Sequence, residues 1–350
     1  MSRPLVTAVV AAFNEEGHIE KCLHDLLAQD GLDGTVEILV IDGGSQDRTV
    51  ELVKRFIEPG DPVALLHNPK RLQVHAWNMG ARAAKAQYVA LISAHTEYSS
   101  DYLASCIHAL EATGAANVGG IQVPVGQGHV GGVIAWAMQS PFAIGNGRFR
   151  YASTAEFVDH VFTIFLKRST FEAMGGYDES FAVNEDCEFD YRLRKAGHTI
   201  YCTPAIKVKY HARPSIPSLA RQMYRYGYWR RRTQLRHPEY VPLRVMAPPL
   251  LLLTCAISGV VFAATGWLPS LAALMPYGAF LAVAAASAVL KLKDPIALLI
   301  APAVLMSMHL SYGLGWWVGF FAHRKRHVSK WPGSFAQAQT GVGAHATSNG

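Results

Sequence analysis

Residues 38–47 read ILVIDGGSQD, in which an unbroken apolar run is followed by an acidic side chain, two glycines and further polar residues. Continuous apolar runs of this length are typical of parallel strands that are covered on both faces. Four such runs are predicted as strands: Leu5–Ala12, Val36–Ile41, Val63–Leu66 and Tyr88–Ile92. Apolar residues recur at helical spacing within residues 19–27 and 50–57. Strands that alternate with helices predict a doubly wound, mostly parallel α/β sheet.

Ligands of such sheets bind beyond the carboxyl ends of the strands, where loops from neighbouring strands meet. The polar residues that follow the predicted strands are Asn14–Glu16, Asp42–Ser45 and Ser93–Glu97. We therefore expect these three segments to form the ligand-binding edge of the sheet.

The middle of the chain is less regular. Residues 119–147 are rich in glycine and are predicted to be loop-like, whereas Val158–Leu166 is predicted to be one further strand. Glu185–Lys195 has a helical pattern, and Gly197 is a suitable residue to end that helix. Pro214–Arg244 is predicted as an amphipathic helix rich in arginine and aromatic residues, a composition that is typical of interfacial helices.

The last third of the chain indicates a membrane protein. Charged side chains are absent from Ala247 to Leu290, a stretch long enough for two spans of about 20 residues each. A third apolar segment follows at 295–321. The predicted regions are a catalytic domain at 1–214, an interfacial helix region at 215–246, transmembrane segments at 247–321, and a basic, then flexible, tail at 322–350.

Charge and cysteine content narrow the function classes. The net charge is +6, and six arginines lie within 221–236, which suits phosphates or anionic lipid. Because this basic cluster directly precedes a membrane span, nucleic acid is not expected as a partner. The predicted spans hold almost no ionisable residues, which argues against a transporter. The five cysteines show no C-x-x-C spacing, so we expect a reducing, cytoplasmic environment for the catalytic domain.

Four sequence blocks, in this order and spacing, carry a resemblance to a known family. They lie at 9–16, 38–47, 88–95 and 175–186, within a match of roughly residues 5 to 232. Together they resemble the family-2 glycosyltransferases, whose nucleotide-sugar-binding domain has the GT-A fold. Residues 210–230 are similar to the membrane-bound enzymes that extend succinoglycan-like exopolysaccharides.

The resemblance implies a reaction and its partners. An inverting hexosyltransferase would take a hexose from a nucleotide sugar, here a UDP-sugar, and add it to a lipid-linked (polyprenyl diphosphate) saccharide in surface-polysaccharide or glycolipid assembly. Two alternatives stay open: a synthase of polyprenyl-phosphate sugars, and a membrane-bound pseudo-glycosyltransferase that binds or scaffolds without catalysis.

The resemblance also implies donor-binding residues. These are Asn14, Glu16, Asp42, Arg71, Asn78, Ser93 and His95. Asp42 would accept hydrogen bonds from the nucleobase, with the following glycines allowing close approach; its alternative is a turn aspartate that bonds its own backbone. Asn14 has a compatible second interpretation as the cap of the next helix.

The family's Glu-Asp pair falls on Glu185 and Asp186, which the resemblance makes the catalytic residues. Asp186 would act as general base on the acceptor hydroxyl. The alternative is an acidic helix face that is partnered by Arg192 and Arg194.

The metal-binding block departs from the family pattern. The usual Asp-x-Asp, which holds a divalent ion (Mn²⁺ or Mg²⁺) on the donor diphosphate, reads Ser93-Ala94-His95 here. An imidazole suits first-row metals, so His95 is a candidate metal ligand, but Ser93 does not replace a carboxylate's charge. His211 or Glu97 could compensate.

The acceptor-binding candidates lie before the first predicted span: Arg213, Gln222, Arg225, Trp229 and Arg230. The alternative is an anchoring helix whose arginines reach the membrane surface. With a cytoplasmic donor pool, we expect a multi-pass protein of the inner membrane, with its catalytic domain on the cytoplasmic side. Because the basic residues 323–326 favour the inside, 295–321 would then be re-entrant or surface-lying.

Overall fold

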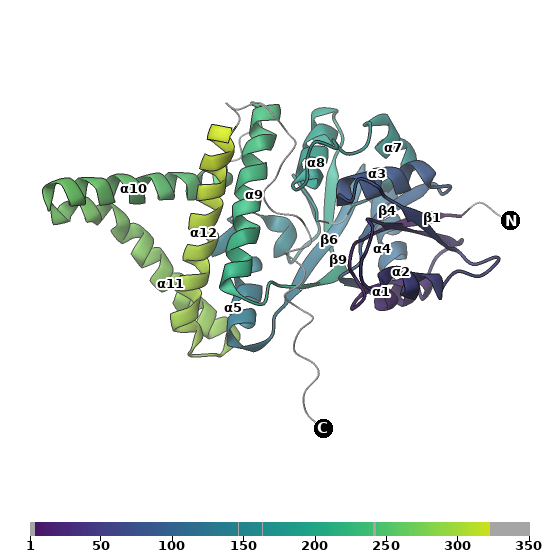
Figure 1. Cartoon of the computed structure of the whole chain (residues 1–350), viewed down its shortest axis with the longest axis horizontal. Coiled ribbons are helices and arrows are strands. Elements are labelled where there is room, and N and C mark those ends of the chain that lie inside the picture. Colours follow the sequence, from purple (N-terminus) through teal and green to yellow (C-terminus); the bar gives the residue numbers. More distant parts are fainter. Residues whose placement is uncertain (1–3, 146, 163, 241–242, 323–350) are drawn as a thin grey trace, which may run out of the picture. The chain divides into compact units, whose positions relative to one another are not determined.

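The computed structural model describes residues 4–145, 147–162, 164–240 and 243–322. The chain forms two compact units (Figure 1). We call Met1–Val123 together with Arg148–Tyr210 the sheet unit, and Pro124–Gly147 together with His211–Lys330 the helical unit. The predicted basic and flexible tail, at 322–350, lies outside the described residues from position 323 on.

The predicted N-terminal strands are confirmed, with ends that differ by one residue. They are β1 (Val6–Ala12), β2 (Val36–Asp42), β3 (Val63–His67) and β4 (Tyr88–Ser93), and their pairs β3–β2, β2–β1 and β1–β4 are parallel. The whole sheet has the order β3-β2-β1-β4-β8-β6-β9-β5, with β7 paired to β9. The added strands are β5 (Thr96–Tyr98), β6 (Asn117–Val125), β7 (Glu156–Val158), β8 (Ile164–Lys167) and β9 (Ile200–His211). Their described pairs are antiparallel.

Helices cover both faces of the sheet. The core on one face includes side chains of α1 (Ile19–Leu27), α2 (Thr49–Lys54) and α4 (Tyr102–Thr113). The core on the other face includes side chains of α3 (Gln73–Ala83), α7 (Arg168–Ala173) and α8 (Glu185–Lys195). Helix α8 ends as predicted, because Gly197 adopts a φ of 88° and His198 N–H donates to the Leu193 carbonyl.

Two predictions for the middle of the chain are wrong. Val158–Leu166 is not one strand but the end of β7 and most of β8, because His160 turns inward to bond Asp190 instead of continuing the sheet. Residues 119–147 are not a loop: they contain most of β6, then α5 (Gly128–Met138) and α6 (Pro141–Ile144). Some of their glycines allow two backbone segments to approach closely: a Cβ on Gly120 in β6 would lie 1.8 Å from the carbonyl oxygen of Ile206 in β9.

The helical unit also contains α9 (Ile216–Arg236), α10 (Ala247–Thr265), α11 (Met275–Leu292) and α12 (Ala297–Ala322). Short 3-10 turns lie in the same unit at Leu243–Val245 and Leu268–Leu274, and another lies in the sheet unit at Arg148–Arg150. Among the described residues, three stretches are long and apolar enough to cross a membrane: Leu243–Thr265, Leu268–Leu292 and Ala297–Ala322. Helix α12 is continuous, with Pro302 inside it, so the expected interruption of the third segment is not found.

Helices α9 and α12 run side by side in direct backbone contact (Figure 1). A Cβ added to Gly315 would lie 1.9 Å from the Tyr224 carbonyl oxygen, and one added to Gly227 would lie 1.9 Å from the Tyr312 carbonyl oxygen. The Arg231 guanidinium stacks 4.7 Å from the Trp316 ring centre. The arginine-rich helix is therefore packed along the last apolar helix.

Candidate active site

The loops after β1 and β2 are bonded to each other. Asn14 N–H donates to Ser45 Oγ at 2.9 Å, and Asn14 Oδ1 accepts from Gln46 N–H at 2.8 Å. Glu16 is exposed, and its carboxylate accepts from Arg48 N–H at 3.1 Å. Asn14 does not cap α1, which begins at Ile19; a φ of 54° instead turns its side chain toward the β2 loop. Asn14 and Glu16 therefore shape the ligand-binding edge of the sheet.

Asp42 ends β2 at this edge and is 6% exposed. Its carboxylate accepts from Gly44 N–H at 2.9 Å and from Ser45 Oγ–H at 2.6 Å, and the Ser45 N–H lies 3.2 Å from both of its oxygens. Asp42 is thus a turn aspartate that bonds nearby backbone groups, as one of the two interpretations above expects. Three donors on about four acceptor positions leave room for one more. A Cβ on Gly43 would lie 3.1 Å from the Arg71 carbonyl oxygen, so a larger residue there would require the two loops to shift apart by a few tenths of an ångström.

Arg71 and Asn78 differ in their surroundings. Arg71 is exposed, has a φ of 63°, and lies beside Gly44 in the loop before α3. Asn78 is 2% exposed and uses its amide inside the protein. Its Nδ2–H donates to the Tyr177 carbonyl at 2.9 Å, and its Oδ1 accepts from Tyr177 N–H at 2.9 Å. Asn78 therefore holds the loop before α8, and we do not retain it as a donor contact.

A buried carboxylate lies beside the altered metal-binding block. Glu15 is 5% exposed, and its Oε1 is 3.1 Å from His95 Nδ1. Ser93 Oγ lies 3.1 Å from His95 Nε2. Glu97 instead faces Lys21 and Lys209, at 3.9 and 3.4 Å. The sequence prediction missed Glu15, although it stands between two residues that were selected.

Glu185 and Asp186 open α8. Asn184 precedes them with a φ of 73°, and both acids lie in the first turn, where the helix dipole favours negative charge. Glu185 is 8% exposed, whereas the Asp186 side chain is 25% exposed and so is accessible to a ligand. Of the predicted basic partners, Arg192 bonds Glu188 at 2.9 Å. Asp186 is not part of that ion pair.

Behind Asp186 lies a buried polar cluster that the sequence prediction missed. His160 Nε2 is 3.6 Å from Asp186 Oδ2, and His160 Nδ1–H donates to Asp190 Oδ2 at 2.8 Å. Asp190 Oδ1 accepts from Asn117 Nδ2–H at 2.8 Å. Asp186 and Asp190 are four residues apart on one helix face, a spacing that could have suggested the pair. Nothing in the sequence pointed to His160.

Two groups of side chains were tested as holders of a divalent metal. Glu15 and His95 offer a carboxylate and an imidazole 3.1 Å apart at the carboxyl ends of β1 and β4, which suits a first-row ion that takes its other ligands from a diphosphate and water. His160, Asp186 and Cys187 also bring donor atoms within 4.8 Å of one another. His160 Nδ1–H donates to Asp190, so only Nε2 could bind an ion there, and at 4% exposure the ring is closed to a donor diphosphate. The first group, at the strand ends, therefore fits a donor-bound ion better.

The other candidates lie in the helical unit. His211 is the last residue of β9 and is exposed, and Arg213 is half-buried in the loop before α9. Gln222 and Trp229 are buried on α9 at 9% and 8% exposure, so they contribute mainly to packing. The remaining two, Arg225 and Arg230, are half-buried; the latter donates to Tyr240 Oη at 3.2 Å.

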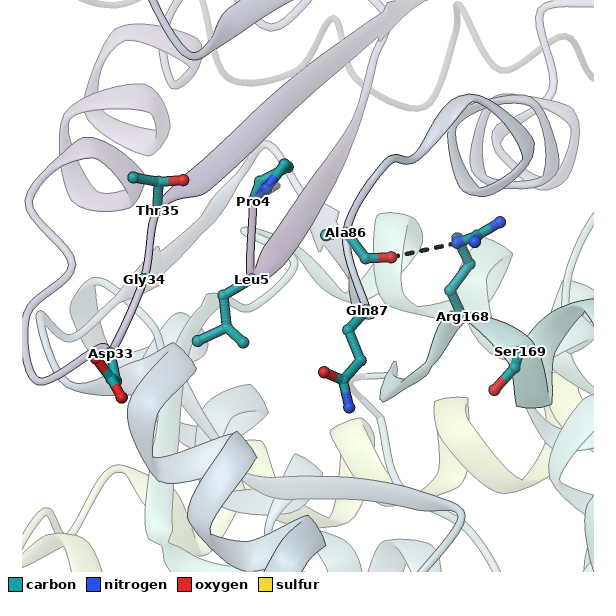
Figure 2. A pocket seen from close by; sticks show the side chains of 9 residues that line it. All are labelled: Pro4, Leu5, Asp33, Gly34, Thr35, Ala86, Gln87, Arg168 and Ser169. Carbon is teal, nitrogen blue, oxygen red and sulfur yellow. Dashed lines mark hydrogen bonds between the residues drawn. The ribbon is translucent and has the colours of Figure 1, made fainter. Parts of the chain in front are cut away.

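A cavity of about 570 Å³ lies elsewhere on the sheet unit (Figure 2). Its lining residues are Pro4, Leu5, Asp33, Gly34, Thr35, Ala86, Gln87, Arg168 and Ser169. Arg168 Nε–H donates to the Ala86 carbonyl there at 3.2 Å. Several of these residues precede β1, β2 and β4, so the cavity is at the amino ends of the strands, away from the edge described above. We do not include it in the candidate active site.

Comparison with known proteins agrees with this architecture. The sequence model for glycosyl transferase family 2 matches residues 7–174. The succinoglycan biosynthesis protein ExoA of Rhizobium meliloti (strain 1021) is 32% identical over 91% of this chain and 96% of its own length. A dolichyl N-acetyl-α-D-glucosaminyl phosphate 3-β-D-2,3-diacetamido-2,3-dideoxy-β-D-glucuronosyltransferase of Methanococcus voltae is 29% identical over 63% of this chain and 71% of its own.

A solved structure shares the fold. The mannosyltransferase PcManGT of Pyrobaculum calidifontis, solved with GDP-mannose and Mn²⁺, superposes with a TM-score of 0.60 and 20% identity over 89% of this chain and 88% of its own. This likeness supports the GT-A-type fold predicted for the sheet unit. Together with the extent and identity of the ExoA match, it leads to one conclusion: this chain is a glycosyltransferase that belongs to glycosyl transferase family 2.

Proposed function

We propose that the protein is an inverting hexosyltransferase that moves a hexose from a UDP-sugar to a lipid-linked saccharide at the cytoplasmic face of the inner membrane. The observation that carries the proposal is the position of Asp186. It is a partly exposed carboxylate at a helix N-terminus, in the same unit as the ligand-binding edge of the parallel strands. The relationship to a succinoglycan biosynthesis protein supports a role in surface-polysaccharide assembly.

In the proposed reaction Asp186 is the general base. As the acceptor oxygen attacks the anomeric carbon, Asp186 takes the hydroxyl proton. The bond from that carbon to the nucleoside diphosphate breaks, and its electron pair leaves with the diphosphate. Attack from the face opposite the leaving group inverts the anomeric centre. Glu185, buried beside Asp186, adds negative charge to the same helix turn.

For the donor, we propose contacts from Asn14, Glu16, Asp42 and Arg71, which lie in the loops at the carboxyl ends of the strands. Asp42 has acceptor capacity left for a nucleobase N–H, and the exposed Arg71 can reach an anionic group. Ser93 is 8% exposed and lies next to His95, so we assign it to shaping the metal site.

We propose that Mn²⁺ or Mg²⁺ would be held by His95 and Glu15, with His211 as a further candidate. A bound divalent ion supplies positive charge against the diphosphate as it leaves. Glu15 provides the carboxylate that Ser93 lacks, because it is the acid whose oxygen lies 3.1 Å from His95.

For the acceptor, we propose that Arg213, Arg225 and Arg230 contact a lipid diphosphate, since guanidinium groups bind phosphate oxygens in pairs. The Methanococcus voltae relative is named for a dolichyl-linked sugar phosphate. That name favours a lipid-linked saccharide over the lipid phosphate itself as acceptor.

The packing of α9 on α12 supports a particular membrane arrangement. Six arginines lie within residues 221–236, and each would cost about 2.5–3.5 kcal/mol at the centre of a bilayer. Tyr224 and Tyr228 of this helix contact Gly315 and Gly319, so the second half of α12 lies at the level of these arginines. We propose that α10 and α11 cross the membrane and that α9 and α12 lie together at its cytoplasmic surface.

The test uses the purified full-length protein in detergent. Hydrolysis and transfer are measured with UDP-glucose, UDP-galactose, UDP-N-acetylglucosamine and GDP-mannose, in Mn²⁺, Mg²⁺ or chelator. The proposal predicts turnover of one UDP-sugar with inversion, seen by NMR of the product. Asp186→Asn should lower turnover by at least ~100-fold while nucleotide binding persists. Asp30→Asn, an exposed aspartate, is the matched control.

Either of two outcomes would contradict the proposal. Near-normal turnover by Asp186→Asn would remove the general base. Nucleotide binding without turnover of any donor, even with lipid-linked saccharide added, would replace catalysis by binding.

A further inference from the structure

A row of polar side chains runs from Asp186 into the interior of the sheet unit. Asp186 faces His160, His160 donates to Asp190, and Asp190 accepts from Asn117. The row ends on the backbone, because Asn117 Oδ1 accepts from Phe165 N–H at 3.2 Å. Each member is thus held by the next, and the outermost member is the proposed base.

The burial of this row is unusual for such polar groups. His160 is 4% exposed, and both Asp190 and Asn117 are 0% exposed. Removing an imidazole and a carboxylate from water is costly unless their bonds are made inside the protein. The bonds of Asn117 and Asp190 lead to one ring, whose Nε2 lies 3.6 Å from the partly exposed carboxylate of Asp186. The geometry suits a support for that carboxylate.

The orientation of Asp186 depends on this ring. Asp186 Oδ1 accepts from the Cys187 N–H at 2.7 Å, while Oδ2 faces His160 Nε2 at 3.6 Å. The Phe149 ring packs edge-on against the imidazole, with ring centres 4.8 Å apart. The imidazole therefore has little freedom to turn away.

The charge of the ring follows from its neighbours. Burial alone would lower the pKa of His160, but Cys187 and Asp186, together with the hydrogen bond to Asp190, outweigh it and raise that pKa well above its ordinary value. The titratable groups around the cluster are Asp186, Cys187 and Asp190 on α8, Cys202 on β9, and Tyr177 in the loop before α8. With a raised pKa, the imidazole carries a positive charge at neutral pH.

We propose that His160 is a positioning residue of the transfer reaction, which holds the Asp186 carboxylate in one orientation, and that Asp190 holds the imidazole in place. This inference rests on the proposed role of Asp186 as general base. A base that is aligned before the acceptor arrives needs no rearrangement when the hydroxyl approaches.

The experiment compares His160→Gln and Asp190→Asn with wild type and with His198→Gln. His198 is an exposed histidine just beyond the other end of α8, so the same substitution there changes no contact of the cluster. For each full-length variant in detergent, kcat and KM are measured from pH 5 to 9 with the nucleotide sugar of the panel above that wild type turns over fastest.

The inference predicts a kcat lowered by ~10- to 100-fold in both cluster variants, with KM for the donor nearly unchanged, because positioning acts on the chemical step. The pH–kcat profile of His160→Gln should differ in shape from that of wild type, because the imidazole, whose pKa is raised by its acidic neighbours, is no longer there to titrate. His198→Gln should match wild type.

Three outcomes separate the two ideas. If His160→Gln and Asp190→Asn fold and have wild-type kcat while Asp186→Asn is inactive, the positioning role is wrong but Asp186 is still the base. A lower kcat with an unchanged pH–kcat profile would overturn the part played by the imidazole charge and indicate a purely structural role. If His160→Gln does not fold, Asp190→Asn tests the positioning role by the same measurements, because asparagine keeps the shape of the aspartate side chain. Activity in Asp186→Asn would instead overturn the base assignment itself.

Discussion

The contact between α9 and α12 should be sensitive to a single methyl group. A Cβ added to Gly315 would lie 1.9 Å from the Tyr224 carbonyl oxygen and 3.0 Å from the Tyr228 nitrogen. Backbone atoms cannot swing aside, so the helices would have to separate by roughly 1–1.5 Å to reach van der Waals distance. Gly315→Ala should therefore disturb the packing of both helices.

The magnitude follows from two opposed terms. Overpacking costs typically about 1–3 kcal/mol, and a backbone contact this short belongs at the upper end. Replacing glycine by alanine inside a helix regains about 1 kcal/mol. We therefore expect Gly315→Ala to lower the free energy of unfolding by about 2 kcal/mol. The nearby stacking of Arg231 on Trp316 and the Trp316 bond to Gln234 would weaken with it.

The assay is thermal unfolding in detergent, followed by tryptophan fluorescence. Gly259 and Gly278 lie in α10 and α11 with open space where a Cβ would be, so Gly259→Ala and Gly278→Ala are matched controls. At about 1–2 °C per kcal/mol for a chain of 350 residues, Gly315→Ala should lower the midpoint by ~2–4 °C. A midpoint equal to that of the controls would refute the close packing of α9 on α12.

Further predictions concern the two units separately. Burial alone would raise the pKa of Glu179, but hydrogen bonds from Lys70 and Asn78 lower that pKa to about 2. The contribution of Glu179 to stability is therefore present at neutral pH and lost as pH falls from about 5 toward 2. Glu179→Gln should cost about 1 kcal/mol at pH 7, allowing for solvent screening, and little near pH 2; equal losses at both would contradict this. Asn78→Ala should lower the melting midpoint by ~3–8 °C, because its buried bonds to the Tyr177 backbone are lost. The KM for the donor should stay unaltered in the folded protein. A raised donor KM with a normal midpoint would instead show that Asn78 contacts the donor. Replacing Arg225 and Arg230 together by glutamine should raise KM for a lipid-linked acceptor by ~10-fold or more while donor KM is unchanged; equal effects on both would indicate anchoring instead.

The parallel half of the sheet could be predicted from the sequence because its signals are local. Each buried strand is a continuous apolar run, and the acid or polar residue that ends it, such as Asp42 or Ser93, marks the carboxyl edge where a ligand binds. The acidic start of α8 and its glycine stop are equally local. The fold class and the place of the candidate base were therefore within reach of a single sequence.

Only the tertiary structure decided which side chains meet. Glu15 and His95 are 80 residues apart, and His160 and Asp190 are 30 residues apart with β8 and α7 between them, so no local pattern encodes either pair. Likewise, glycines 120 and 315 resemble loop or flexible positions in sequence, yet each allows a backbone contact with a distant segment. Periodicity and composition report what one segment buries, whereas a close contact depends on how two segments pack. That is why the sequence alone determined the parallel strands and the apolar helices, while the antiparallel half of the sheet and the polar row behind Asp186 were decided by packing.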